Sequence, residues 1–199
     1  KISRVYVGDG AMSNGQVFEA FNLASLWSLP VLFIIENNRY GMGTAVNRSA
    51  AGKDLYERAT VFGVEGEKIN GMDFFEVSQA AIRARDHIYD NSMPYVIEMD
   101  TYRYRGHSMS DPATYRTKDE VNEMKSNDPL ISMKNKLMKD FKIKEDEITD
   151  IEANIKKQIK EVEKFSLESP LPDLNELFTE VYLWTFYFQP FPLLWNKET

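Results

Sequence analysis

The 199-residue chain is 43% hydrophobic and 28% charged, a balance typical of a soluble globular protein with a core of ordinary domain size. Its net charge of −7 and its pI of about 5.0 exclude the basic surface that non-specific nucleic-acid binding requires. The chain has no cysteine, so disulfides and thiolate metal sites are excluded, and no apolar run reaches the roughly 18 residues of a membrane span. We therefore expect a soluble protein with no nucleic-acid or membrane partner.

The first residues predict a βαβ unit. Val5–Gly8 has the pattern of a short buried strand, and it follows Lys1 closely, without an initiator Met or a signal peptide, so we expect a domain truncated at its N-terminus. Pro30 ends an expected helix over residues 14–28, and the apolar run Val31–Ile35 is typical of a parallel strand covered on both faces. The helix is indicated by apolar residues at helical spacing, namely Val17, Ala20, Phe21, Ala24 and Trp27.

A second unit and a helical region follow. Asp73 is the expected N-cap of a helix over Phe74–Tyr89, and Tyr95–Met99 is the next expected strand. Tyr102–Arg116 lacks periodicity and is rich in Arg, Ser, Gly and Pro, so it is expected to be a loop. Beyond it, one apolar stripe on a long amphipathic helix is formed by Ile148, Ile151, Ile155, Ile159, Val162 and Phe165. This stripe is expected to pack against its own domain or a neighbouring subunit.

Gly8-Asp9-Gly10 stands at the carboxyl end of the first strand and opens a helix, which is where open α/β sheets bind phosphorylated ligands. Two ligands compete for this position. A dinucleotide fingerprint requires Gly-x-Gly-x-x-Gly, but the last position is Ser13, although Glu36 resembles the acid that binds a ribose. The Asp9 carboxylate would repel a pyrophosphate unless a cation lay between them. Asp9 therefore favours a metal-bridged diphosphate.

Asn37–Gly41 follows the second expected strand. If the two strands pair in parallel, their ends lie about 4.8 Å apart. The Asp9 carboxylate and the Asn38 amide oxygen can then reach one ion. Magnesium prefers about six oxygen ligands in near-octahedral geometry and shares them between protein and phosphate. A carboxylate, a carboxamide, a backbone carbonyl and a pair of phosphate oxygens would leave one position for water.

These residues carry a family resemblance. Gly8-Asp9-Gly10, followed at this distance by Asn37-Asn38, resembles the thiamine-diphosphate signature. Glu36–Thr44 (ENNRYGMGT) and Tyr102–Pro112 (YRYRGHSMSDP) closely resemble segments of the alpha subunits of thiamine-diphosphate-dependent 2-oxoacid dehydrogenases, above all the pyruvate dehydrogenase group. Three motifs in the right order make the resemblance specific, and it extends over residues 1–183.

The resemblance implies roles for particular residues. Asp9, Asn38 and the backbone carbonyl of Tyr40 would bind magnesium, and the backbone N–H groups of Gly10 and Ala11 would bind the diphosphate of thiamine diphosphate. Without a ligand, the glycines would form a tight turn and the asparagines a plain turn. The pairing of Asp9 with Asn38 favours the ligand site over these simpler interpretations.

The second loop supplies the remaining candidates. The resemblance implies that His107 contacts the diphosphate and is the catalytic candidate of this chain, whereas a histidine taken alone is more often solvated or a cap. Its position between Gly106 and Ser108, in an Arg-rich loop, favours anion binding. In the mitochondrial relatives this loop is a target of inactivating phosphorylation, so Ser108 and Thr114 are candidate phosphorylation sites. The simpler interpretation of Ser108 is a loop hydroxyl.

The expected architecture is α/β, with a parallel sheet and βαβ crossovers in the thiamine-diphosphate-binding fold, followed by a helical C-terminal region. We expect an α/β domain over residues 1–116 that binds thiamine diphosphate and magnesium, and a helical region over residues 117–183. Residues 184–199 form an aromatic tail that matches nothing in the family. The chain would be the C-terminal part of an alpha subunit.

The resemblance also implies an activity and partners. The complete enzyme would decarboxylate pyruvate oxidatively and transfer the acetyl unit to a lipoyl group, while this chain alone would be inactive. Its partners would be a beta subunit, in an α2β2 heterotetramer, and a lipoyl-bearing acyltransferase component. The alternatives are a branched-chain 2-oxoacid or acetoin dehydrogenase, or a non-catalytic fragment of a decayed gene. The expected compartment is the cytoplasm of a bacterium, which is favoured, or the mitochondrial matrix of a eukaryote.

Overall fold

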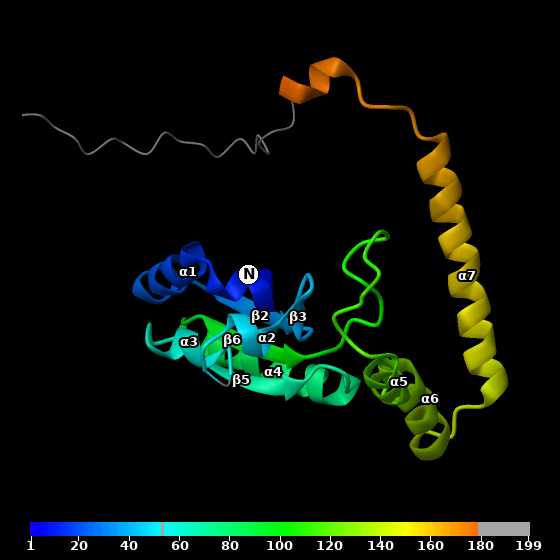
Figure 1. Ribbon diagram of the computed structural model, residues 1–199, viewed down its shortest axis with the longest axis horizontal. Coiled ribbons are helices and arrows are strands. Elements are labelled where there is room, and N and C mark those ends of the chain that lie inside the picture. The colour runs from blue at the N-terminus through cyan, green and yellow to red at the C-terminus, as the bar shows by residue number, and fades with distance from the viewer. Residues whose placement is uncertain (53, 179–199) are drawn as a thin grey trace, which may run out of the picture. The chain divides into compact units, whose positions relative to one another are not determined.

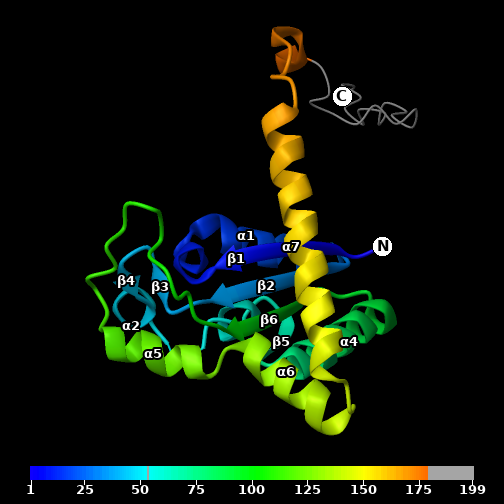
Figure 2. The same cartoon turned by 90° about the vertical axis from the view of Figure 1, so that its right-hand side faces the viewer.

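A four-stranded parallel sheet forms the centre of the first part of the chain (Figure 1). The computed structural model describes residues 1–52 and 54–178. The strands are β1 (Ser3–Gly8), β2 (Val31–Asn37), β5 (Glu65–Asn70) and β6 (Tyr95–Asp100), and their order across the sheet is β1-β2-β6-β5. All neighbouring pairs are parallel, which confirms the predicted α/β class (Figure 2).

The first predicted βαβ unit is present, because β1 and β2 are parallel neighbours joined by helix α1 (Gly15–Leu26). Asn14 caps α1, since its side chain accepts a hydrogen bond from the N–H of Gln16. The expectation that Gly8-Asp9-Gly10 opens this helix is wrong. A separate 3-10 turn, η1 (Asp9–Ser13), comes between the strand and the helix.

The second βαβ unit consists of β5, α4 (Phe74–Asn91) and β6, of which the sequence predicts only the last two. α4 begins at the predicted cap, where Oδ1 of Asp73 accepts hydrogen bonds from the N–H groups of Phe75 at 2.8 Å and Glu76 at 3.2 Å. β5 lies at the edge of the sheet, and Ile69 is its one buried residue.

The side chains of β2 alternate between two cores, one on each face of the sheet, as the continuous apolar run predicts. On one face, Phe33 packs edge to face against Phe21 of α1, with 4.8 Å between the ring centroids. The other buried members of that core are Met12, Ala24, Ile35, Leu55, Ala59, Val64 and Val96. On the opposite face, α4 covers the sheet, and the core contains Leu32, Ile34, Ile69, Ala80, Ala84, Ile88 and Ile97.

Short elements connect β2 to β5. The antiparallel strands β3 (Tyr40–Gly41) and β4 (Thr44–Ala45) form a small hairpin directly after β2. Two single-turn helices follow, α2 (Val46–Ser49) and α3 (Glu57–Thr60). This arrangement places the hairpin beside η1, because both follow the carboxyl ends of neighbouring strands.

Residues 102–116 form neither helix nor strand, as predicted. Helices α5 (Lys118–Ser126) and α6 (Pro129–Asp140) follow, and both belong to a compact unit that extends from Lys1 to Lys144. A second unit starts at Glu145, and its described elements are α7 (Glu145–Glu168) and η2 (Leu174–Phe178). The predicted division at residues 116 and 117 stays a prediction, and the predicted tail of residues 184–199 lies outside the described residues.

α7 is the predicted long helix with an apolar stripe. Ile148 is buried, whereas the rest of the stripe is more than half exposed, namely Ile151, Ile155, Ile159, Val162 and Phe165. Packing of this face against a neighbouring subunit therefore stays a prediction. Among the helices of the described residues, none combines the length and the apolar character that a membrane span requires.

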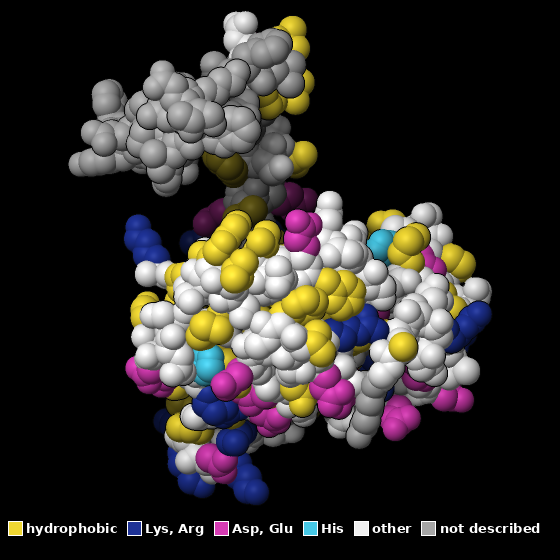
Figure 3. Space-filling model, turned by 90° about the vertical axis from the view of Figure 1, so that its left-hand side faces the viewer, with side chains coloured by type: hydrophobic (Ala, Val, Ile, Leu, Met, Phe, Trp, Pro, Cys, Tyr) yellow, Lys and Arg dark blue, Asp and Glu magenta, His cyan; other side chains and the backbone are white. Residues whose placement is uncertain are grey.

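The first unit also exposes apolar side chains in and around α1 and α3. Leu26 is 69% exposed, Trp27 60% and Val61 78%. Figure 3 views the side on which these helices lie in Figure 1, and hydrophobic side chains are visible over its surface. These exposed apolar side chains supply surface that another chain can cover in an assembly.

Candidate cofactor and metal site

The carboxyl ends of β1 and β2 bring the first two predicted motifs to one edge of the sheet. Gly8 is the register partner of Glu36, so the segments that follow these residues start side by side. A Cβ atom added to Gly41 would lie 3.2 Å from Cα of Gly10 and 3.6 Å from Oδ2 of Asp9. The turn η1 and the strand β3 therefore meet backbone to backbone, and a larger residue at position 41 would push against the Gly10 backbone.

Asp9 is the most unusual group at this edge. It is 4% exposed, and its Oδ2 accepts no hydrogen bond from any of the described residues. Burial raises the pKa of the Asp9 carboxyl, although its own N–H, the Arg103 guanidinium and the N–H of Gly10 lower the pKa in part. A buried carboxylate oxygen without a partner is costly, and a cation would satisfy it. The same oxygen disfavours a dinucleotide pyrophosphate without a metal, because the two anions repel each other.

The loop after β2 holds Asn38 and Tyr40 in a strained backbone. Arg39 and Met42 have φ values of 72° and 55°, in the left-handed region that costs a non-glycine residue roughly 1 kcal/mol. Oδ1 of Asn37 accepts a hydrogen bond from the N–H of Arg39 at 3.2 Å, and Oδ1 of Asn38 accepts one from the N–H of Tyr40 at 3.4 Å. Strain of this kind persists where neighbouring groups hold it, and it occurs often at ligand sites.

Arg103 joins the second loop to the first. Its guanidinium donates to the backbone carbonyls of Tyr40 at 3.3 Å and Met42 at 2.8 Å, and it lies 3.4 Å from Nδ1 of His107. The Arg103 side chain therefore lies between His107 and the Tyr40 carbonyl and contacts both. Sequence reasoning gave Arg103 no role of its own, because the abundance of arginine in this loop does not tell which one faces the site.

Asp111 fixes the turn that carries His107. Its Oδ2 accepts hydrogen bonds from the N–H of His107 at 2.7 Å and the hydroxyl of Tyr115 at 2.9 Å, and its Oδ1 accepts one from the N–H of Ala113 at 2.8 Å. The N–H of His107, more than any other donor, holds the pKa of the Asp111 carboxyl below its usual range. A Cβ on Gly106 would lie 2.5 Å from the Asp111 carbonyl oxygen, so only glycine fits there.

A tyrosine cluster forms the base of the same loop. The Arg116 guanidinium lies 5.2 Å from the ring centroid of Tyr102, 5.7 Å from that of Tyr115 and 5.8 Å from that of Tyr40. Glu120 of α5 accepts hydrogen bonds from the hydroxyls of Tyr40 at 2.9 Å and Tyr102 at 2.7 Å. Burial, together with the Glu120 carboxylate, raises the pKa of Tyr102 to about 12. These contacts attach the base of the loop to the sheet and to α5.

The candidate phosphorylation sites lie at the exposed part of the loop. Ser108 and Thr114 are both exposed, and the Ser108 hydroxyl lies 3.1 Å from that of Ser110. A modifying enzyme could therefore reach Ser108 in this structure without unfolding the loop. Phosphorylation at either position stays a prediction.

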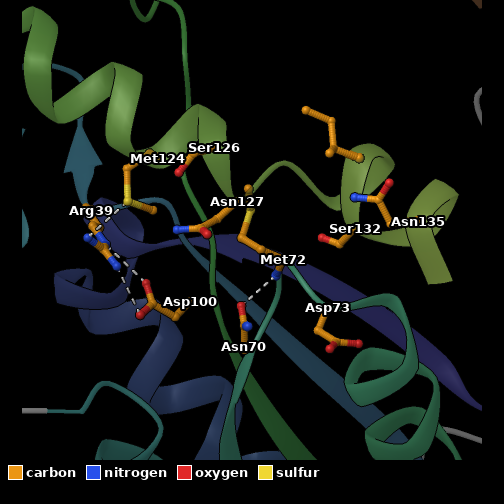
Figure 4. A pocket seen from close by; sticks show the side chains of 11 residues that line it. Arg39, Asn70, Met72, Asp73, Asp100, Met124, Ser126, Asn127, Ser132 and Asn135 are labelled. Atoms are coloured by element: carbon orange, nitrogen blue, oxygen red, sulfur yellow. Dashed lines mark hydrogen bonds and ion pairs between the residues drawn. The ribbon is translucent and has the colours of Figure 1, made fainter. Parts of the chain in front are cut away.

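A pocket of about 690 Å³ adjoins the loop after β2 (Figure 4). The ion pair between Arg39 and Asp100, with Nε 3.2 Å from Oδ1, lies in its wall. The rest of the lining comes from the ends of β5 and α4 and from α5 and α6, namely Asn70, Met72, Asp73, Met124, Ser126, Asn127, Ile131, Ser132 and Asn135. None of the predicted cofactor or metal residues lines this pocket, so the predicted site is a different part of the same sheet edge.

The donor set at the edge suits a magnesium-bound diphosphate. Asp9 supplies a buried carboxylate oxygen that has no partner among the described residues, and Asn38 supplies an amide oxygen. Tyr40 supplies a carbonyl next to Gly41, where an added Cβ would lie 3.6 Å from that Asp9 oxygen. Gly10 and Ala11 are exposed in η1 beside them. The described part of the chain holds no group of three or more His, Cys, Asp or Glu side chains suited to a metal. A metal here would therefore also need amide, carbonyl and ligand oxygens, which magnesium accepts.

The fold and this edge define a parallel α/β protein of the kind that binds phosphorylated ligands at its strand ends. Residues 1–175 match the family model of the dehydrogenase E1 component, and the chain therefore belongs to this family. The resemblance inferred from the three motifs is thereby confirmed at the level of the family.

Curated relatives agree with the family match. Proteins named pyruvate dehydrogenase E1 component subunit alpha are 50% identical over 177 residues in Rickettsia felis and 45% identical over 183 residues in Rhizobium meliloti. The matches cover 89% and 92% of this chain, and 54% and 53% of the relatives. A mitochondrial protein of the same name from Dictyostelium discoideum is 47% identical over 178 residues, or 88% of this chain and 47% of the relative. The chain thus spans about half the length of the curated relatives it matches.

Proposed function

We propose that the chain is part of the alpha subunit of a pyruvate dehydrogenase first component, in which it binds thiamine diphosphate through magnesium. The observation that carries this proposal is the buried Asp9 oxygen, which has no partner among residues 1–52 and 54–178, near Gly41 in a member of the dehydrogenase E1 family. The relatives described above are named for pyruvate, which favours this substrate over the branched-chain 2-oxoacid and acetoin alternatives.

In this proposal the first two motifs hold the metal and the diphosphate. Asp9, Asn38 and the carbonyl of Tyr40 bind magnesium, and the N–H groups of Gly10 and Ala11 donate to the diphosphate. The contact between η1 and β3 supports the grouping, because it places the Asp9 turn against the Tyr40–Gly41 strand. A hard cation with oxygen ligands suits this set, which contains one carboxylate.

The second loop adds the positive charge of Arg103 beside the first loop. Arg103 already donates to two carbonyls of the first loop, so its guanidinium is placed to offset the charge of a bound diphosphate, and His107 lies beside it as a further diphosphate contact. Asp111 keeps His107 in position through its backbone N–H. When bound, thiamine diphosphate supplies the thiazolium ring that acts as the electron sink in decarboxylation.

A beta subunit and a lipoyl-bearing acyltransferase component complete the proposed enzyme. The exposed apolar stripe of α7 and the exposed Leu26, Trp27 and Val61 support an assembly with other chains. The relatives are named as alpha subunits, and this name supports a partner subunit of a second kind.

The test of the proposed function is a substrate comparison in the assembled enzyme. The alpha subunit that contains this chain would be combined with its beta subunit, thiamine diphosphate and magnesium. We expect acyl transfer to a lipoyl domain to be fastest with pyruvate, compared with a branched-chain 2-oxoacid or acetoin as substrate. Equal or faster turnover of a branched-chain substrate would contradict the pyruvate assignment, and absence of any turnover in the complete assembly would contradict the enzyme assignment.

A further inference from the structure

Glu98 is a carboxylate with 0% exposure in β6, outside all three sequence motifs. Ionised groups are very rarely buried to this degree unless their oxygens are fully bonded. Its Oε1 accepts a hydrogen bond from Nδ2 of Asn37 at 2.7 Å. Its Oε2 accepts hydrogen bonds from the N–H groups of Leu55 at 2.6 Å and Tyr56 at 3.0 Å. One side chain therefore joins the end of β2 to the segment that precedes α3.

Lys68 provides the opposite charge. It is the register partner of Glu98 on β5, and its Nζ lies 3.6 Å from Oε1 of Glu98 and 2.7 Å from Oδ1 of Asp54. The carboxylate is thus compensated by a lysine as well as by three hydrogen bonds. The network belongs to four separate segments of the chain, so its arrangement is fixed by the fold and not by local sequence.

The contact to Asn37 determines the geometry of the loop that carries the proposed metal ligands. A carboxylate only accepts hydrogen bonds, so Nδ2 of Asn37 must face Glu98 and Oδ1 must face away from it. Oδ1 then accepts the hydrogen bond from the N–H of Arg39 that holds this residue at its positive φ of 72°. The conformation of Arg39 in turn sets the directions of its neighbours Asn38 and Tyr40.

We infer that Glu98 is a positioning residue, which orients the Asn37 amide and thereby holds Asn38 and the Tyr40 carbonyl in the arrangement that binds the metal. The part of this inference that concerns the metal rests on the proposed function. Glu98 touches neither metal nor diphosphate in this account, and it acts only through Asn37. If Glu98 merely stabilised the core, its substitution would affect the loop after β2 no more than the rest of the chain.

Two single variants and their combination separate these roles. In Glu98→Gln, one half of the side chain becomes an N–H donor, which must face either the Asn37 amide or the N–H groups of Leu55 and Tyr56. Asn37→Asp places a second carboxylate against Glu98 but leaves the contacts to Leu55 and Tyr56, so the fold should survive. In the double variant, the new glutamine donates to the new aspartate, whose other oxygen still accepts from Arg39. Glu65→Gln, an exposed glutamate on β5, is the control.

The first measurement is amide hydrogen exchange of the 199-residue chain without cofactor. We expect each single variant to speed exchange at residues 39–41 by about tenfold, the effect of losing one buried hydrogen bond. The double variant should return to within about threefold of the original chain, since a restored pair shows as coupling. Unchanged exchange at residues 39–41 in both single variants would overturn the inference. Faster exchange spread evenly over the chain, without recovery in the double variant, would also overturn it.

The second measurement is calorimetric binding of thiamine diphosphate with magnesium to the complete alpha and beta assembly. We expect an affinity loss of about tenfold in each single variant and recovery in the double variant. Unaltered affinity in both single variants, where the original assembly binds, would overturn the link between Glu98 and the metal ligands. If the original assembly does not bind, the proposed function is wrong, and the exchange data still decide whether Glu98 controls the loop.

Discussion

Replacement of Asp9 by asparagine should make the metal-free chain more stable while it weakens cofactor binding. The Asp9 carboxylate is almost fully buried, and its Oδ2 has no partner among the described residues. Removing an unsatisfied buried charge should add about 1–2 kcal/mol to the free energy of unfolding, partly offset because Arg103 already attracts the carboxylate. For a chain of this length, that gain corresponds to an increase of ~3–6 °C in Tm.

The stability gain of Asp9→Asn should depend on pH, and the pKa shift of Asp9 fixes the direction of this dependence. Burial raises the pKa of Asp9 above its ordinary value of 3.8, so the folded chain binds the Asp9 proton more tightly than the unfolded chain. Stability from this group is therefore full below the ordinary pKa and is lost as the pH rises through the folded pKa. The Tm advantage of Asp9→Asn should be largest near pH 7 and should narrow as the pH falls toward 4.

Thermal unfolding of the metal-free chain, followed by circular dichroism at several pH values, measures this advantage. Asp86→Asn serves as a control, because Asp86 is about half exposed on α4 and pairs with Arg85. No Tm difference at pH 7, or one that is the same at all pH values, would refute the reasoning. A similar gain in the control would show that the effect comes from net charge and not from the buried oxygen.

Further predictions concern the glycine contact, the exposed loop and the isolated chain. Gly41→Ala should lower the affinity of the assembled enzyme for thiamine diphosphate by about tenfold in calorimetry, since the new carbon would press on Gly10. Gly15→Ala is the control and should leave this affinity unchanged, because a Cβ added to Gly15 meets no atom within 4 Å. Ser108→Glu should reduce turnover with the lipoyl acceptor far more than Ser108→Ala, because it adds negative charge beside His107; equal activities would exclude a role for charge. The 199-residue chain alone should reduce no dye with pyruvate, and measurable reduction would contradict the need for further chain and a beta subunit.

The sequence predicts the elements that carry strong hydrophobic patterns. Val31–Ile35 is identified because a strand covered on both faces must be apolar at every position. β5 is missed because an edge strand with one buried residue, Ile69, carries no such pattern. The separate turn η1 is also missed, since glycine and aspartate after a strand suit a 3-10 turn as well as the start of an α-helix.

Candidate site residues are predictable where function requires a motif, as for Asp9 and Asn38. The groups that hold the motif are not predictable in this way. Glu98 lies 61 residues from Asn37, and Arg103 lies 63 residues from Tyr40, so only the sheet register and the loop path bring these pairs together. Local propensity contains no information about such distant pairings. For the same reason the α7 stripe predicts a buried face but does not say which surface buries it.

The central claim is that Asp9, Asn38 and the Tyr40 carbonyl hold a metal-bound diphosphate. A crystal structure of the complete alpha and beta assembly with thiamine diphosphate and magnesium tests it most directly. We predict a single magnesium ion with an Asp9 oxygen, the Asn38 amide oxygen and the Tyr40 carbonyl at about 2.1 Å, and with diphosphate oxygens among its remaining ligands. A cofactor bound elsewhere on the sheet, or an Asp9 carboxylate that does not touch the metal, would contradict the account.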